Sequence, residues 1–199
     1  MKHPLRTLLL AVLIFLPAVA FAHTPIKGLD NFYNGVLHPF FVPAHILAVL
    51  AVGLLFGRQG SDNIPVLTMG FIAATVLGLG MSGISISADL GAVLVVETAL
   101  IGLLIAADFK LPLHWCLIIG VVAGVIIGLD SSQPDMAGKA KLITLFGSGV
   151  GIYLMILYPM GFADYFNKKP WQLIGVRVLG SWLAASALMV LALLFVPKH

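Results

Sequence analysis

The sequence predicts an all-α protein, a polytopic membrane bundle of about six transmembrane helices that follows a cleaved signal peptide. The first reason is composition, because 60% of the 199 residues are hydrophobic and only 10% are charged. Lipid as the solvent explains that balance, which a soluble domain of this length does not need. The second reason is that apolar stretches of near membrane-spanning length follow one another along the chain. The third is that charged and turn-forming residues separate these stretches.

The first 22 residues have the pattern of a signal peptide. Lys2 and Arg6 precede a short apolar core, and Ala20-Phe21-Ala22 has the small-x-small pattern of a cleavage site. The alternative is an uncleaved anchor helix. Cleavage would leave residues 23–199 as a single transmembrane domain. Its first residue, His23, would then combine a free α-amine with an imidazole, which together can chelate a metal ion.

Six spans are predicted after this signal. They cover residues 38–57, 64–86, 88–107, 112–129, 142–162 and 171–196. A cleaved signal places the mature N-terminus on the periplasmic side of a bacterial inner membrane, so the protein would be a multi-pass inner-membrane protein. Lysine and arginine are shared almost equally between the two sides, and the orientation therefore depends on the signal.

Small residues are spaced for helix packing in two of these spans. Gly120, Gly124 and Gly128 form one ridge at four-residue intervals, and Gly147 and Gly151 form another. Such ridges let helix backbones approach closely in lipid. A tightly packed bundle can bury a polar site at its centre.

His38 and His45, at the start of the first span, are the first candidate metal ligands. Histidines at membrane depth usually face a cavity, a partner or an ion, and imidazole binds nickel, copper, zinc and cobalt well. If a regular helix begins at Pro39, the two histidines share one face of the helix and lie about 10.5 Å apart along its axis. That separation suits two successive binding positions for a moving ion rather than one shared ion. If it begins at Pro43, the preceding segment is irregular and His38 can fold back towards His45.

Glu97 lies near the middle of the third predicted span, where a carboxylate needs a partner or a task. It can ligate a cation or carry a proton, and the alternative is a structural ion pair with Arg177 in the last span. Asp30 and Asp89 are predicted near helix ends on the outer side. Solvation or helix capping explains both, but they can also collect an incoming cation, as can the loop at residues 130–135.

Other functional classes have little support. The formal charge of +3 comes from scattered residues rather than a basic run, so we expect no nucleic-acid partner. A single cysteine, Cys116, excludes a cysteine-based metal cluster. Gly80 to Gly83 match the Gly-x-Ser-Gly of rhomboid proteases, but His114 and His199 are not placed to activate Ser82. We therefore predict that the chain is not an enzyme.

The order of these features resembles the HupE/UreJ family, small polytopic proteins found with hydrogenase and urease genes and regarded as nickel permeases. The resemblance covers nearly the whole mature chain. It rests on His38-Pro39, His45, the run Val96-Glu97 to Gly102, and Arg177 to Gly180.

This chain departs from the family pattern in two places. The first helix of the family usually reads His-Pro-x-x-Gly-x-Asp-His, and here the glycine and aspartate positions are Val42 and Ala44. The fourth helix of the family usually carries two histidines, and here residues 119–124 have glycines without histidines. The resemblance therefore implies a divergent member.

What the resemblance implies is a permease for a divalent transition-metal ion, with nickel first and cobalt or copper next. Its candidate ligands are His38, His45 and Glu97, with His23 and Asp30 for capture. The metal would be cargo, and we expect no permanently bound cofactor. The expected partners are the ion, the lipid bilayer, proteins of metalloenzyme maturation and further copies of the chain.

Two other functions remain open. One is a non-transporting membrane accessory protein for metalloenzyme maturation, which the missing fourth-helix histidines favour. The other is a carrier of another small solute, with the histidines as proton relays. Glu97 favours transport, because a docking platform gains nothing from a mid-bilayer acid.

Overall fold

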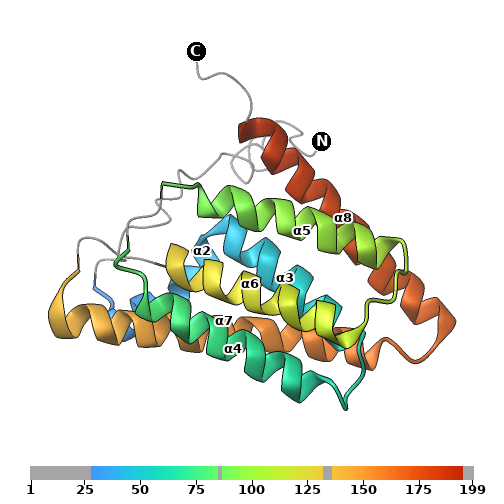
Figure 1. Ribbon diagram of the computed structural model, residues 1–199, viewed down its shortest axis with the longest axis horizontal. Coiled ribbons are helices and arrows are strands. Elements are labelled where there is room, and N and C mark those ends of the chain that lie inside the picture. The colour runs from blue at the N-terminus through green and yellow to red at the C-terminus, as the bar shows by residue number, and fades with distance from the viewer. Residues whose placement is uncertain (1–27, 85–86, 132–135, 195–199) are drawn as a thin grey trace, which may run out of the picture.

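The computed structural model describes residues 28–84, 87–131 and 136–194, and within these ranges it contains seven helices and no strand (Figure 1). The helices are α2 (Asn31–Phe41), α3 (Pro43–Gly57), α4 (Ile64–Gly80), α5 (Leu90–Ala106), α6 (Leu113–Asp130), α7 (Gly138–Tyr165) and α8 (Pro170–Leu194). The predicted all-α class is confirmed. The signal peptide at residues 1–22 and His23 lie outside the described residues.

The first predicted span is broken into two helices, α2 and α3, which meet at Val42 with a bend of 74°. Pro43 begins α3, and a residue before proline is disfavoured in the helical region. Val42 accordingly takes an extended conformation, with φ −97° and ψ 107°. A single regular helix from Pro39 is therefore wrong. The helix does begin at Pro43, but the preceding segment is helical rather than irregular.

Each of the other five predicted spans contains one helix, and several ends differ from the prediction. The helix α4 stops at Gly80 rather than at residue 86, and α7 runs past its predicted span at both ends. The helices α6, α7 and α8 are long and apolar enough to cross a membrane, and the bent pair α2–α3 is a fourth candidate. The apolar helices α4 and α5 are shorter, at 17 residues each. The chain is a multi-pass membrane protein by these apolar helices.

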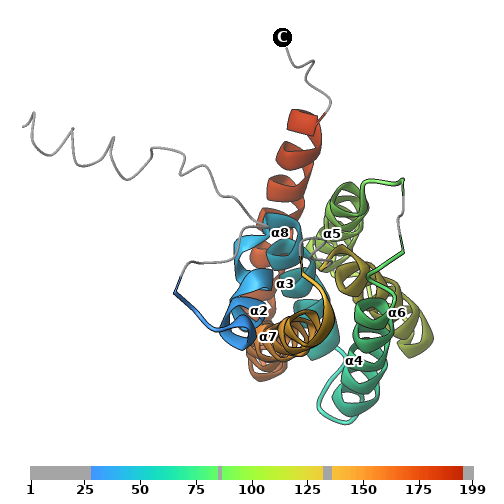
Figure 2. The ribbon, with the colours of Figure 1, turned by 90° about the vertical axis from the view of Figure 1, so that its left-hand side faces the viewer.

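The helix α3 occupies the centre of the bundle. It contacts α7, α5, α6 and α2, and nearly all of its residues from Ala48 to Gly57 are buried. Figure 2 views the bundle from one end and shows α3 enclosed by the other helices, with α2 lying along α7. A helix that is apolar on every face is suited to this position, because it has protein on all sides.

The predicted glycine ridges are confirmed as packing surfaces. A Cβ on Gly128 would lie 2.5 Å from the carbonyl oxygen of Thr75 in α4, and a Cβ on Gly124 would lie 2.6 Å from that of Phe71. The same holds between α2 and α7, where Cβ atoms on Gly147 and Gly151 would overlap backbone carbonyls of α2. Close backbone approach at these points fixes α4 on α6 and α2 on α7.

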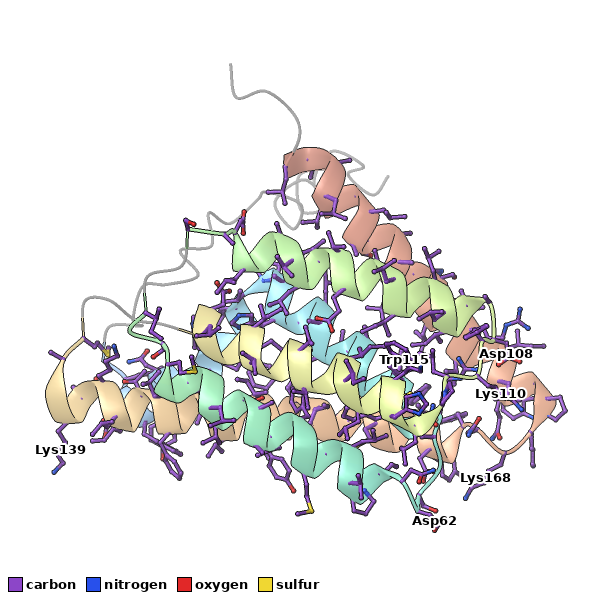
Figure 3. All side chains as sticks on the ribbon, viewed as in Figure 1. Asp62, Asp108, Lys110, Trp115, Lys139 and Lys168 are labelled. Carbon is purple, nitrogen blue, oxygen red and sulfur yellow. The ribbon has the colours of Figure 1, made fainter. Side chains whose placement is uncertain are left out.

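The bundle has two distinct ends, which set the position of the site. The loops at residues 58–63, 107–112 and 166–169 lie together at one end, which we call the Arg58 end. The start of α3, the end of α6 and the start of α7 lie at the other, which we call the His45 end. Figure 3 shows Asp62, Asp108, Lys110 and Lys168 at the Arg58 end and Lys139 far from them.

Candidate functional site

His38 and His45 come together at the bend between α2 and α3. Their ring centroids are 5.8 Å apart in an edge-to-face arrangement. His45 is fully buried, and His38 is only 5% exposed. The extended residue Val42 turns the chain so that the last turn of α2 brings His38 back to the first turn of α3. The predicted approach of His38 to His45 is therefore confirmed, through two helices rather than a helix and an irregular segment.

Asp130 completes this cluster from the end of α6. Its Oδ2 atom lies 2.9 Å from Nε2 of His45, and its side chain is 24% exposed. This hydrogen bond links residues 85 positions apart in the chain. Sequence reasoning had placed Asp130 only in a loop of possible cation collectors and gave it no partner. The sequence shows only that Asp130 is a charged residue at the end of an apolar stretch. That pattern does not indicate that His45 is its partner.

The spacing of these atoms suits the ligands of one metal ion. In an octahedral or square-planar site, two neighbouring ligand atoms that are each about 2.1 Å from the metal lie about 3.0 Å apart, because the angle between them is about 90°. The His45–Asp130 separation of 2.9 Å is close to that value. Imidazole nitrogen and carboxylate oxygen are ligands that nickel, cobalt, zinc and copper accept. A divalent ion that takes the place of the shared proton therefore requires little movement of the two side chains.

The cluster as it stands offers too few side-chain ligands to hold a metal ion. Among the described residues, no three side chains of His, Cys, Asp or Glu are close enough together to hold a metal ion as they stand. His38 is near enough to His45 to be drawn onto the same ion. The Nδ1 atom of His45 is buried and makes no hydrogen bond within the described residues. The coordination shell of an ion bound here would be completed by a shift of His38 and by water or further donors.

Glu97 lies apart from this cluster, seven residues into α5 and about 10 Å along its axis. Its Oε2 atom is buried and has no hydrogen-bond partner in the described part of the chain. The alternative of an ion pair with Arg177 is wrong. The Nε atom of Arg177 instead donates to the carbonyl oxygen of Ala106, at the far end of α5. An ion pair with Arg177 therefore does not explain why a carboxylate is present at position 97 of this apolar helix.

Asp30 does not join the histidines. It precedes α2, is exposed, and lies eight residues before His38, while its side chain makes no capping hydrogen bond. Ser82 and His114, weighed for a protease, lie at opposite ends of the bundle, because α4 ends near Ser82 and α6 begins near His114.

The comparisons with known proteins agree on one family. Residues 10–190 match the family model described as "HupE / UreJ protein". The chain is also 30% identical over 198 residues to Protein HupE of Rhizobium leguminosarum bv. viciae, a match that covers 96% of this chain and all of that relative. No solved structure matches the chain. With its apolar helices and a family match that spans most of its length, the chain belongs to the HupE/UreJ family.

Proposed function

We propose that the protein is a permease for a divalent transition-metal ion, with nickel as the first candidate and cobalt or copper next. One observation carries the proposal: His45 lies fully buried between the ring of His38 and the carboxylate of Asp130, at the end of the central helix. A transporter needs a site of this kind, built of polar side chains and enclosed by helices.

Asp130 supports the choice of a divalent cation over a neutral solute. The family pattern has an aspartate directly before its second histidine, where this chain has Ala44. Asp130 brings a carboxylate to His45 from another helix. The donor set of two imidazoles and one carboxylate therefore persists in a different arrangement. The family connection favours nickel among the metals that such donors accept.

Glu97 supports passage of the ion beyond this first site. The helix α3 offers an apolar surface from Ala48 to Gly57, where a bare cation has no ligand. Glu97, on a helix that packs against α3, supplies a buried carboxylate at an intermediate depth. The proposed path begins with capture near His23 and Asp30, continues at His38, His45 and Asp130, and passes Glu97.

The proposed membrane arrangement has six spans, with the mature N-terminus on the periplasmic side of the bacterial inner membrane. The 17-residue helices α4 and α5 are about 25 Å long at 1.5 Å per residue, which is at the short end for a spanning helix. Both pack side by side with long helices, α4 with α6 and α5 with α8. That packing supports counting them as spans.

A second candidate is a carrier of another solute that uses the histidines for protons. The His45–Asp130 pair favours it specifically, because a histidine bonded to a carboxylate is a proton relay. A metal-binding accessory protein that does not transport is the third candidate. Glu97 argues against it, since a protein that only docks partners has no use for that carboxylate.

The decisive experiment measures the metal content of whole cells by mass spectrometry across nickel, cobalt, copper, zinc, iron and manganese. Cells express the wild type or the His38→Ala, His45→Ala or Glu97→Ala variant at equal membrane levels. The matched control is His114→Ala, because His114 is exposed and begins α6 at the Arg58 end. We expect the cellular content of one metal to change when the wild type or the control variant is expressed. In cells that express any of the other three variants, the content of that metal should stay at the background level. If no metal changes in any strain, the permease proposal fails and the accessory protein takes its place.

A further inference from the structure

A polar cavity lies at the Arg58 end, at the opposite end of the bundle from the histidines. Its volume is about 360 Å³, and it opens between the end of α3, the loop from α5 to α6 and the start of α8. Arg58, Gln59, Asp108, Lys110 and Asn167 supply its polar lining. Nothing in the proposed metal path uses this cavity.

Arg58 is fixed in this cavity by several contacts. Its side chain is 7% exposed, and its Nη2 atom donates to Oδ1 of Asp108. Its own carbonyl oxygen accepts a hydrogen bond of 3.2 Å from Asn167. A guanidinium carries five N–H donors in a rigid fork, and two of them are used, by Nη2 towards Asp108 and by Nη1 towards the carbonyl oxygen of Ile105 at 3.5 Å. The remaining donors are held at a buried position, which lowers the entropy cost of binding a ligand there.

The charges around the cavity favour an anion. Lys110 adds a second cation to the lining, and Asp108 is the only acid among the lining residues. Burial lowers the pKa of Arg58, Asp108 raises it and the nearby Arg177 lowers it. The lining therefore holds two cations and one carboxylate, and Arg177 acts on Arg58 from outside the lining. Like charges repel a divalent metal ion from such a cavity, so it does not serve as a mouth for the metal path.

We propose that this cavity binds a phosphate group, supplied by the headgroup of an anionic phospholipid or by free phosphate. Arginine matches the oxygens of a phosphate in a two-pronged manner, and lysine binds it as a point charge. Leu55, Phe109 and Leu173 line the same cavity and give it an apolar side. Basic pockets of this kind between transmembrane helices bind anionic lipid headgroups in membrane proteins.

The test measures lipid binding to the full-length protein in detergent by native mass spectrometry, with phosphatidylglycerol and phosphatidylcholine as the two probes. We expect phosphatidylglycerol to bind more tightly, and Lys110→Gln to weaken its binding about fivefold. The matched control is Lys139→Gln, because Lys139 is an exposed lysine at the His45 end. Arg58→Lys serves as a second variant, which keeps the positive charge but removes the paired N–H donors of the guanidinium.

A second arm adds inorganic phosphate and glycerol 3-phosphate. Binding of these soluble anions that depends on Lys110, without a preference for phosphatidylglycerol, supports the site with free phosphate as its source. If neither lipid nor soluble phosphate binds, or if Lys110→Gln and Lys139→Gln bind equally, the proposal is overturned. Metal content in cells does not enter this test, so its outcome is independent of the proposed permease activity.

Discussion

At the scale of single residues, Asp130 is the part of the site that the sequence did not reveal. The prolines and the two histidines are local features, and the approach of His38 to His45 was one of the two alternatives that the sequence left open. Asp130 reaches His45 through the packing of α6 beside α3, across 85 residues of chain. Neither periodicity nor composition encodes which helix ends meet.

Removal of the Asp130 charge should weaken metal binding while the fold is retained. In Asp130→Asn the amide can still accept a hydrogen bond from His45, but it is a poorer ligand and no longer favours a cation. We expect nickel affinity, measured by titration calorimetry on purified protein, to fall by about 10- to 100-fold. Asp62→Asn is the control, since Asp62 is an exposed acid at the Arg58 end. Equal affinity in the two variants would exclude Asp130 from the site.

Glu97→Gln should separate binding from transport. The substitution preserves the shape of the side chain and removes a charge that no described cation pairs with. Because Glu97 lies apart from His45, we expect nickel to bind the purified variant with unchanged affinity. Uptake of nickel into vesicles should fall to the background of vesicles without protein. Normal uptake in this variant would remove Glu97 from the path.

At the scale of helices, the contact between α2 and α7 holds the histidine pair together. A Cβ on Gly35 would overlap the carbonyl oxygen of Thr144, so the backbones of α2 and α7 touch at this point. The sequence identified Gly147 and Gly151 as packing residues but did not identify α2 as their partner. Residues 31–37 precede the first predicted span, which begins at residue 38, and only the three-dimensional arrangement reveals that they belong to a helix packed against α7.

Gly35→Ala should therefore displace α2 and disturb the site at a distance. We expect the free energy of unfolding to fall by about 1–3 kcal/mol, because the added methyl group has no space. Nickel affinity should fall with it as His38 moves away from His45. Gly161→Ala in α7 is the matched control, because a Cβ there meets nothing within 4 Å. Thermal unfolding in detergent measures the stability, and titration calorimetry measures the nickel affinity. A variant with normal stability and normal affinity would show that this contact does not position His38.

At the scale of the whole molecule, the two ends of the bundle differ in charge. Among the described residues, Arg58, Lys110, Lys168, Lys169 and Arg177 lie towards the Arg58 end, whereas Lys139 and Lys141 lie at the His45 end. Lys27 and Lys198 lie outside the described residues, and counting them with Lys139 and Lys141 gives four lysines opposite these five residues, which is the near tie that the sequence predicts. The contact of Arg177 with Ala106 places it at the Arg58 end. This small excess agrees with the cytoplasmic placement of the Arg58 end that a cleaved signal peptide predicts.

Cysteine labelling of whole cells tests that orientation. Cys116 is buried, so we expect little labelling of the native protein, and a thiol introduced elsewhere can be detected above it. We expect a membrane-impermeant maleimide to label Lys139→Cys in intact cells and to label Lys168→Cys only after the cells are opened. Labelling in the reverse order would mean that the histidine cluster faces the cytoplasm, and the proposed direction of capture would have to be reversed.

The enclosed position of α3 has a consequence for the order of events during synthesis. This helix leaves the ribosome before α5, α6 and α7, which later surround it. It must therefore reside in the bilayer for a time with lipid as its neighbour, which its uniformly apolar faces permit. His45 meets Asp130 only after α6 has been inserted, when about two-thirds of the chain has been made. A nascent or truncated chain that ends before residue 130 thus holds both histidines without their carboxylate, so the proposed metal site would form late in biogenesis.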